Sequence, residues 1–308
     1  MTEPLWVPSE ERRQKAQLTR YRQWLAETHG LRFAVGDYQS LWRWSVDELE
    51  DFYASVWEYF AVDADPGYDA VLGRREMPGA EWFPGARLNY AHHVFRGKTD
   101  DEVAVRFASE RAGPESWTWG DLRARTAALA AGLRNAGVGP GDRVAAYLPN
   151  IPEALAAGLA VMSLGAIWSA CSPDFGVRSV VDRFAQIEPA VLLAVDGYRY
   201  GGRDHSRLGE VRSLQEALPS LRRTVLLRHL DRRADVSGLR DTVLWEYFEE
   251  PGTTLQFENV PSDHPLWVVY SSGTTGLPKP IVHSHGGMLV DQLKYGHFHF
   301  DAKAGDRL

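Results

Sequence analysis

The chain has 308 residues, of which 44% are hydrophobic and 24% are charged, and its formal net charge is −7 at pH 7. This composition is typical of a globular protein and excludes a disordered or fibrous chain. The acidic balance also argues against nucleic acid as a partner, because the phosphate backbone repels an acidic surface. The single cysteine, Cys171, cannot form an internal disulfide, so we expect a reducing compartment such as the cytoplasm.

One stretch is long and apolar enough to resemble a membrane span. Residues 154–173 contain no charged side chain, but they are rich in Ala, Gly and Ser, and Gly165 interrupts them. A buried helix followed by a buried strand fits this pattern better. The first 17 residues mix both signs of charge and lack the apolar centre of a signal peptide. We therefore expect a cytoplasmic protein that does not bind membranes.

Residues 1–100 differ from the rest because they hold six of the eleven tryptophans. The pattern predicts a helix over Glu11–His29 that ends at Gly30. Ser45–Glu48 has the form of a capping box, and apolar residues at helical spacing follow it as far as Phe60. We expect residues 1–100 to form a helical N-terminal segment whose aromatic side chains pack rather than bind a sugar or a base.

From about residue 101 the predicted elements alternate between strand and helix. Strands are expected near 103–107, 143–148, 166–170, 190–195, 224–228 and 266–270, and helices over 118–135, from 152, and over 177–187. Such alternation is typical of an α/β fold with a mainly parallel sheet that is covered by helices on both faces. We expect residues 101–308 to form one such domain, and an incomplete one. Residues 304–307 resemble the turn at 139–143 that leads into a strand, so the chain is expected to be the N-terminal part of a longer protein.

The strongest chemical signal is the sequence Y-S-S-G-T-T-G-L-P-K at residues 270–279, directly after an apolar strand. Glycines allow backbone N–H groups to approach a phosphate closely, while hydroxyls and a lysine add donors and positive charge. These properties suit the β- and γ-phosphates of a nucleotide. The candidate phosphate-binding residues are Ser271, Ser272, Gly273, Thr274, Thr275, Gly276 and Lys279.

The spacing excludes a Walker A loop. That loop requires four residues between its glycines, then Lys and a hydroxyl residue that opens a helix. Here Gly273 and Gly276 are three positions apart, and Lys279 is followed by Pro280 and a predicted strand. A surface loop without a ligand is the other alternative, and the number of matching positions disfavours it.

The motif S-S-G-T-T-G-x-P-K resembles the phosphate-binding signature of the adenylate-forming superfamily, which includes acyl-CoA synthetases, luciferases and peptide-synthetase adenylation domains. The resemblance covers essentially the whole chain. Residues 82–91 are similar to the N-terminal segment of short-chain acyl-CoA synthetases, and residues 139–150 to the first conserved stretch of the superfamily. Residues 168–176 and 277–287 are most similar to the branch that activates acetoacetate.

This resemblance implies an acid–thiol ligase that acts on small molecules. The carboxylate of acetoacetate attacks the α-phosphate of ATP with the help of Mg²⁺, pyrophosphate leaves, and the thiol of coenzyme A displaces AMP. Another short-chain acyl-CoA ligase and a non-catalytic nucleotide-binding protein remain as alternatives. Pro280 replaces the usual glycine, and the family's adenine-, ribose- and metal-binding motifs and its adenylation lysine do not occur in these residues. No catalytic residue or metal ligand is therefore assigned, and the 308-residue chain alone is expected to be inactive.

Three weaker features of the sequence involve arginine, histidine and cysteine side chains. Arg199 and Arg203 follow a predicted buried strand, where related synthetases bind the phosphates of coenzyme A with two arginines; ordinary solvated loop arginines are the alternative. Two His-x-His pairs, ending at His285 and His299, are more typical of packed or surface histidines than of a metal site, because no acidic or cysteine cluster accompanies them. Cys171 has an apolar context and is expected to be a buried thiol.

Overall fold

The computed structural model describes residues 5–34, 36–272 and 276–307. It divides into two compact units: a helical unit made of residues 1–86 and 286–308, and a sheet unit made of residues 87–285. Each is described by itself below.

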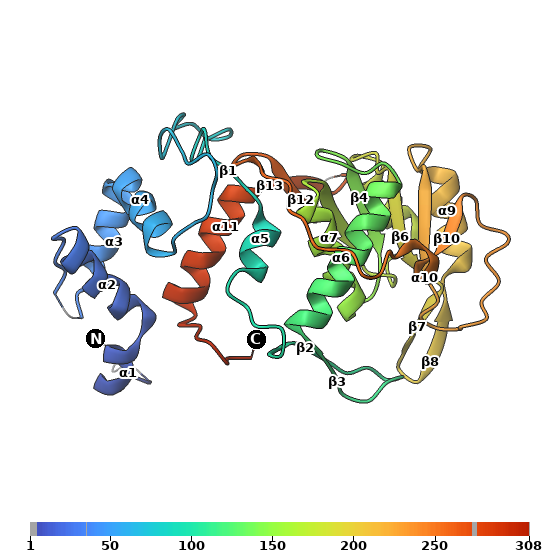
Figure 1. Cartoon of the computed structure of the whole chain (residues 1–308), viewed down its shortest axis with the longest axis horizontal. Helices are drawn as coiled ribbons and strands as arrows, with labels where there is room; N and C mark the ends of the chain where they lie inside the picture. Colours follow the sequence, from blue (N-terminus) through green and yellow to red (C-terminus); the bar gives the residue numbers. More distant parts are fainter. Residues whose placement is uncertain (1–4, 35, 273–275, 308) are drawn as a thin grey trace. The chain divides into compact units, whose positions relative to one another are not determined.

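The helical unit is built around aromatic side chains. Tyr21 is fully buried, its hydroxyl shares a hydrogen bond of 2.7 Å with Ser55 Oγ, and its ring stacks on Phe298 with centroids 4.4 Å apart. Among the tryptophans of this segment, the expected packing role is confirmed for Trp57, which is buried, whereas Trp6 and Trp42 are exposed. The elements are α1 (Glu10–Lys15), α2 (Gln17–Thr28), α3 (Tyr38–Asp47), α4 (Leu49–Tyr59), the part of α11 (His285–Lys294) after its first residue, and the π-helical turn η1 (Tyr295–His299) (Figure 1).

Two local predictions for this unit are wrong. The helix expected over Glu11–His29 is divided at Ala16, whose extended backbone (φ −66°, ψ 143°) ends α1 and begins α2, although Gly30 does follow the second helix with φ +69°. Ser45 caps nothing, because it lies inside α3 and its hydroxyl donates to the carbonyl oxygen of Trp42, 2.7 Å away. Glu48 precedes α4 without a capping side-chain bond. The hydroxyl of a serine inside a helix can donate a hydrogen bond to the carbonyl oxygen three residues earlier. The capping pattern alone therefore does not determine where a helix begins.

The sheet unit contains one seven-stranded sheet in the order β10-β9-β6-β4-β5-β12-β13. Every neighbouring pair is parallel except the last, where β13 runs antiparallel to β12. The strands are β4 (Arg143–Tyr147), β5 (Ile167–Cys171), β6 (Val191–Val195), β9 (Arg223–Leu227), β10 (Thr242–Leu244), β12 (Pro265–Ser271) and β13 (Lys279–Ser284). The predicted α/β fold with a mainly parallel sheet is confirmed.

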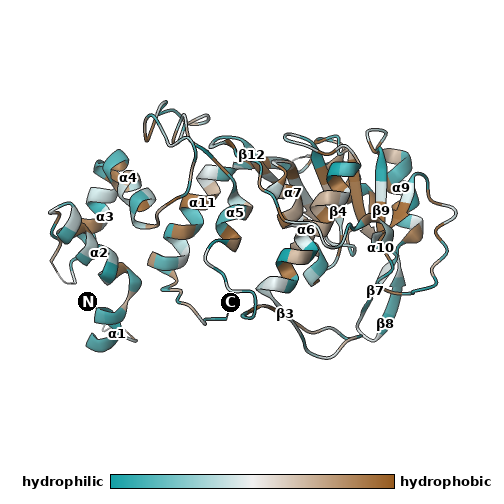
Figure 2. Cartoon of the chain, in the orientation of Figure 1, coloured by the Kyte–Doolittle hydropathy of each residue, from teal (hydrophilic) through white to brown (hydrophobic). Residues whose placement is uncertain are grey.

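Both faces of the central strands β4 and β6 are buried, whereas β13 at one end of the sheet is largely exposed. On one face, Tyr147 and Leu192 pack in a hydrophobic cluster with Phe184 of α8 (Val177–Phe184) and Leu214 of α9 (Leu208–Ala217). Side chains alternate along a strand, so Val144 points to the opposite face, and it too is inaccessible to solvent. Figure 2 shows the hydrophobic residues concentrated on the central strands and on the helix faces turned toward them. The helices are α6 (Trp119–Asn135), α7 (Pro152–Ser163), α8 (Val177–Phe184), α9 (Leu208–Ala217) and α10 (Trp245–Phe248).

The start and end of α6 follow the sequence closely. Thr118 and Asp121 form a capping box, in which each side chain accepts from the backbone N–H of the other residue. Gly137, with φ +77°, follows the end of the helix, where a residue with a Cβ atom would be strained. The expected strand at 103–107 is confirmed as β2.

Smaller elements complete the sheet unit. Helix α5 (Tyr90–Phe95) follows β1 (Arg87–Leu88), which pairs with β11 (Val260–Pro261). Two hairpins, β2–β3 and β7–β8, lie outside the large sheet. Their strands are β2 (Val103–Phe107), β3 (Glu115–Thr118), β7 (Gly197–Tyr200) and β8 (Arg203–Ser206).

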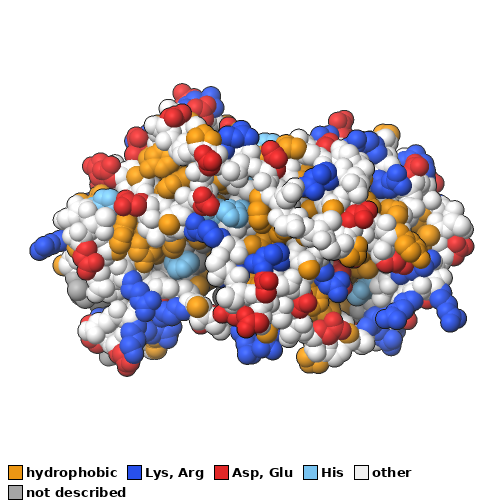
Figure 3. Space-filling model, viewed as in Figure 1, with side chains coloured by type: hydrophobic (Ala, Val, Ile, Leu, Met, Phe, Trp, Pro, Cys, Tyr) orange, Lys and Arg blue, Asp and Glu red, His pale blue; other side chains and the backbone are white. Residues whose placement is uncertain are grey.

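The apolar stretch 154–173 forms most of α7 and all of β5, as expected for a buried helix and strand. Among the residues that the structure describes, no helix is both long and apolar enough to cross a membrane. Figure 3 shows acidic and basic side chains intermixed over most of the visible face.

Candidate functional site

The predicted phosphate loop joins β12 to β13. Ser271, the last residue of β12, is paired with Lys279, the first residue of β13, so the two ends of the loop lie on adjacent strands. Ser272, Gly276 and Lys279 are all exposed to solvent. The predicted residues Gly273, Thr274 and Thr275 lie outside the described residues. The strand expected after the loop is confirmed as β13.

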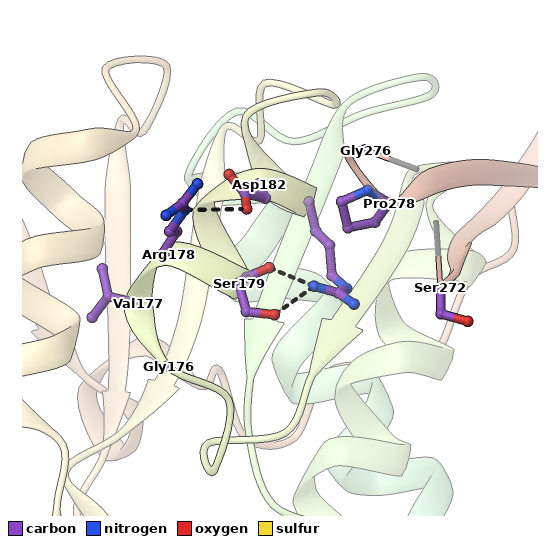
Figure 4. A pocket seen from close by; sticks show the side chains of 9 residues that line it. Gly176, Val177, Arg178, Ser179, Asp182, Ser272, Gly276 and Pro278 are labelled. Atoms are coloured by element: carbon purple, nitrogen blue, oxygen red, sulfur yellow. Dashed lines mark hydrogen bonds and ion pairs between the residues drawn. The ribbon is translucent and has the colours of Figure 1, made fainter. Parts of the chain in front are cut away.

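The described ends of this loop border an open cleft of about 630 Å³. Ser272, Gly276 and Pro278 line it from the loop, and residues 176–179, 182 and 183 line it from α8 (Figure 4). Gly176 precedes α8 and supplies no capping side chain. The cleft therefore combines hydroxyl and backbone donors of the loop with a helix that carries two arginines, and this combination suits an anion.

Helix α8 is attached to the segments on both sides of the loop. The hydroxyl of Tyr270 donates to the carbonyl oxygen of Arg183 over 2.8 Å, and Nε2 of Gln186, just beyond the helix, donates to the carbonyl oxygen of Pro278 over 3.0 Å. Burial raises the pKa of Tyr270 to about 12, so its hydroxyl keeps its proton at neutral pH. These two bonds fix the positions at which the loop leaves β12 and returns to β13.

Sequence reasoning missed this role of α8. The signal that could have found it is topological: β5 and β12 are parallel neighbours, so the segments that follow them meet at one edge of the sheet. That adjacency is not readable from strand lengths or hydrophobic patterns. It places Arg183 and Gln186, about 90 residues before the loop in sequence, beside the loop in space.

Cys171 ends β5 close to this cleft, and it is buried with 4% of its surface exposed. Burial raises the pKa of its thiol to about 11, and the positive charge of Arg183 offsets that effect only in part. The sequence shows no basic residue near Cys171, whereas the fold brings Arg183 near it. A thiol that remains protonated at neutral pH is a poor nucleophile, so the expected structural role is supported.

Histidines of the two His-x-His pairs occupy structural positions. His285 begins α11, and His283 Nδ1 accepts a hydrogen bond of 2.7 Å from the indole N–H of Trp267. His297 Nδ1 lies 3.0 Å from the carbonyl oxygen of Leu293. In the described ranges, no three His, Cys, Asp or Glu side chains converge as metal ligands would.

The candidate coenzyme A arginines both lie in the β7–β8 hairpin and are exposed. Arg199 faces Asp204 across the hairpin, and their side chains are 3.6 Å apart. Arg203 is paired with Tyr200. Neighbouring residues of a strand point to opposite faces, so the pairing register places the two guanidinium groups on opposite faces of the hairpin. The structure therefore does not bring Arg199 and Arg203 together as a single clamp.

Comparisons with known proteins agree with this architecture. The family model described as "AMP-binding enzyme" matches residues 92–308, and "Acetyl-coenzyme A synthetase N-terminus" matches residues 38–94. The chain is 39% identical over 318 residues to an acetoacetyl-CoA synthetase of Macaca fascicularis and 40% identical over 317 residues to an acetoacetyl-coenzyme A synthetase of Rhizobium meliloti (strain 1021). These matches cover 99% of this chain, and 46% and 47% of the two relatives.

A solved structure, acetoacetyl-CoA synthetase from Streptomyces lividans, is 50% identical, with a TM-score of 0.94 over 100% of this chain and 47% of that one. The chain thus spans about half the length of the relatives that it matches. A family match that covers more than two thirds of the chain, a mainly parallel sheet and a Gly-, Ser- and Thr-rich loop beside a cationic cleft lead to the same assignment: the chain belongs to the AMP-binding enzyme family.

Proposed function

We propose that this chain is part of an acetoacetate–CoA ligase, which forms acetoacetyl-CoA from acetoacetate, ATP and coenzyme A and releases AMP and pyrophosphate. The single observation that carries the proposal is the similarity over the full length of this chain to acetoacetyl-CoA synthetases, at 39–50% identity in the three comparisons given above. The cleft beside the loop supports it, because it offers donors to a polyphosphate. The substrates are small molecules, and neither nucleic acid nor a membrane is part of the proposed reaction.

In this proposal the loop holds the β- and γ-phosphates of ATP while the carboxylate of acetoacetate attacks the α-phosphate. Ser271 and Ser272 donate hydroxyl hydrogen bonds, and Lys279 supplies a point charge at the start of β13. The proposed contacts extend to Gly273, Thr274, Thr275 and Gly276 on the strength of the sequence motif. Donors that bind the leaving pyrophosphate more strongly as its charge grows would accelerate formation of the acyl-adenylate.

Mg²⁺, when bound to ATP, would neutralise part of the polyphosphate charge. No group of three or more His, Cys, Asp or Glu side chains comes together in the described part of this chain, and no step is derived through the ion. Coenzyme A enters in the second half of the reaction, where Arg199 and Arg203 are proposed to contact its nucleotide phosphates separately. A cytoplasmic site of action is proposed from the single, buried cysteine.

The test uses the longer protein that contains this chain. Purified protein is incubated with ATP, coenzyme A and one of acetoacetate, propionate or butyrate, and thioester formation is measured. We expect the highest kcat/KM with acetoacetate, and a higher value with propionate or butyrate would support a different short-chain ligase. Nucleotide binding without any thioester would support a non-catalytic protein. Residues 1–308 alone are expected to form no thioester.

A further inference from the structure

Arg183 is a cationic side chain in the cleft that the sequence motif does not include. It lies near the end of α8, it is half-buried, and it lines the cleft together with Ser272 and Pro278 of the loop. Its position relative to the loop ends is set by the hydrogen bond from Tyr270 to its carbonyl oxygen.

The guanidinium of Arg183 is held in one orientation by neutral groups. Nη1 donates to both the carbonyl oxygen and the hydroxyl of Ser179, each over 2.6 Å (Figure 4). The guanidinium carbon also lies 5.2 Å from the ring centroid of Phe175 and 5.9 Å from that of Tyr270. Two aromatic faces and one serine thus orient the side chain, which reduces the entropy that it loses when a ligand binds.

No carboxylate among the described residues lies within ion-pair distance of Arg183, so its charge is not neutralised there. Arg178 differs in this respect, although it is on the same helix and lines the same cleft. Its Nε lies 4.0 Å from Asp182, and its side chain is 95% exposed. An oriented, half-buried guanidinium without an internal counter-charge is suited to bind an anion with several oxygens, such as a polyphosphate.

We infer that Arg183 binds the polyphosphate of ATP, and the pyrophosphate formed from it, opposite the loop residue Ser272. This inference rests on the proposed function, because it assigns the cleft to the nucleotide of the adenylation step. Arg183 thereby becomes a second source of positive charge for the polyphosphate, supplied by α8 rather than by the loop.

The test compares R183M, R183K and the matched control R178M in the longer protein. R183M removes the oriented charge, whereas R178M removes a solvated charge from the same helix. For each variant, the dissociation constants of ATP, pyrophosphate and AMP are measured by calorimetry, and KM is measured for ATP, acetoacetate and coenzyme A. Thermal unfolding of each variant reports on the fold.

We expect R183M to weaken the binding of ATP and pyrophosphate by roughly ten- to a hundredfold, the range for a lost charge-assisted hydrogen bond, and to leave AMP binding and the KM for coenzyme A unchanged. R178M should weaken the binding of ATP and pyrophosphate less than R183M does, because the Arg178 side chain is almost fully solvated and lies beside Asp182. R183K should lie between the wild type and R183M, because it restores the charge without the planar fork.

Three results would overturn the inference: unchanged binding of ATP and pyrophosphate in R183M, an equal loss for AMP, or an equal rise of all three KM values with a lower melting temperature. If R183M does not fold, R183K decides, and wild-type affinity for pyrophosphate in R183K contradicts the inference. The dissociation constants measured by calorimetry do not depend on whether the protein catalyses the reaction. A protein that makes no acetoacetyl-CoA but loses pyrophosphate binding in R183M would therefore refute the proposed ligase and not the role of Arg183.

Discussion

The backbone N–H of Tyr90 donates a hydrogen bond to Nδ1 of His285 across 3.2 Å, inside the sheet unit. His285 is completely buried, and its Nε2 has no hydrogen-bond partner among the described residues. Because Nδ1 accepts a bond, it carries no proton, and the imidazole is neutral. Burial, with His264 nearby, lowers the pKa of His285 to about 3.

This geometry predicts a stability that falls in acid. The folded state keeps His285 neutral, whereas the unfolded chain binds a proton with a pKa near 6.5. The neutral His285 therefore makes its full contribution to the free energy of unfolding above about pH 6.5. This contribution is lost as the pH falls toward 3, by up to ~1.4 kcal/mol per pH unit. Urea unfolding at pH 7.5 and 5.5 measures it. His285→Asn, which keeps an acceptor near Nδ1, should reduce this dependence, and the half-exposed control His205→Asn should not. Equal pH slopes in wild type and His285→Asn would contradict the prediction.

Lys279→Ala tests the loop. The side chain is exposed at the start of β13, opposite Ser271, so its removal should not disturb the core. If Lys279 contacts the polyphosphate in the transition state, adenylation should slow by on the order of 10²-fold. ATP–pyrophosphate exchange in the longer protein measures this step. Lys303→Ala removes an exposed lysine from the helical unit and should exchange at the wild-type rate. Wild-type exchange in Lys279→Ala would remove Lys279 from the proposed site.

Arg199→Ala and Arg203→Ala are expected to have unequal effects. Their side chains lie on opposite faces of the β7–β8 hairpin, so one nucleotide phosphate of coenzyme A should contact one of them more closely. The KM for coenzyme A should rise in that variant by about tenfold at most, because both side chains are exposed. Acyl-adenylate formation should not change in either variant. Equal kinetics with coenzyme A and 3′-dephospho-coenzyme A in the wild type would exclude both arginines as contacts of the 3′-phosphate.

Asn89 should be important for the stability of the sheet unit. Its buried side-chain amide donates to the carbonyl oxygens of Met162, Ser163 and Glu258, at 3.0, 3.3 and 2.8 Å, and its Oδ1 accepts from the N–H of Ala91. Asn89→Ala would leave several of these buried groups without a partner, and we expect a loss of about 2–3 kcal/mol in the free energy of unfolding.

The matched control for Asn89 is Asn135→Ala. The Asn135 side chain is exposed and bonds only Glu250 among the described residues, at 3.3 Å, so its loss should cost less than about 0.5 kcal/mol. Chemical denaturation of both variants gives the comparison. Similar losses in the two would show that the buried network does not stabilise the fold.

Two helical glycines should respond in opposite directions to alanine. A Cβ atom at Gly132 in α6 would lie 2.1 Å from the carbonyl oxygen of Phe248, so Gly132→Ala must displace backbone and should be destabilising by about 2 kcal/mol or more. Gly209 in α9 has open space around it, and Gly209→Ala should stabilise by about 0.5–1 kcal/mol through helix propensity. The melting temperatures of Gly132→Ala and Gly209→Ala test the close packing of α10 against α6. Equal shifts in the two variants would contradict this packing.

Local sequence signals were sufficient for much of the sheet unit. The apolar runs at 143–148 and 266–270 predicted β4 and β12 to within a residue or two, because strands of a mainly parallel sheet are rich in apolar residues. The same signals were insufficient at Ala16 and Ser45, where several backbone and capping geometries are compatible with one short pattern. The residues of the candidate phosphate loop could also be predicted from the sequence, since glycines and hydrogen-bond donors in one continuous segment are the pattern expected for phosphate binding.

Only the tertiary structure decided which residues lie beside that loop. The pairing of β12 with β5 brings Arg183 and Gln186 to it, and the register of β7 with β8 separates Arg199 from Arg203. Both results depend on strand pairing between segments distant in sequence or on the alternation of side chains across a hairpin. The sequence by itself thus determined the α/β class and the presence of glycines, hydroxyls and a lysine in one short loop, because these depend on local composition and spacing. The fold decided how charge is arranged around that loop, because that arrangement depends on which strands are neighbours.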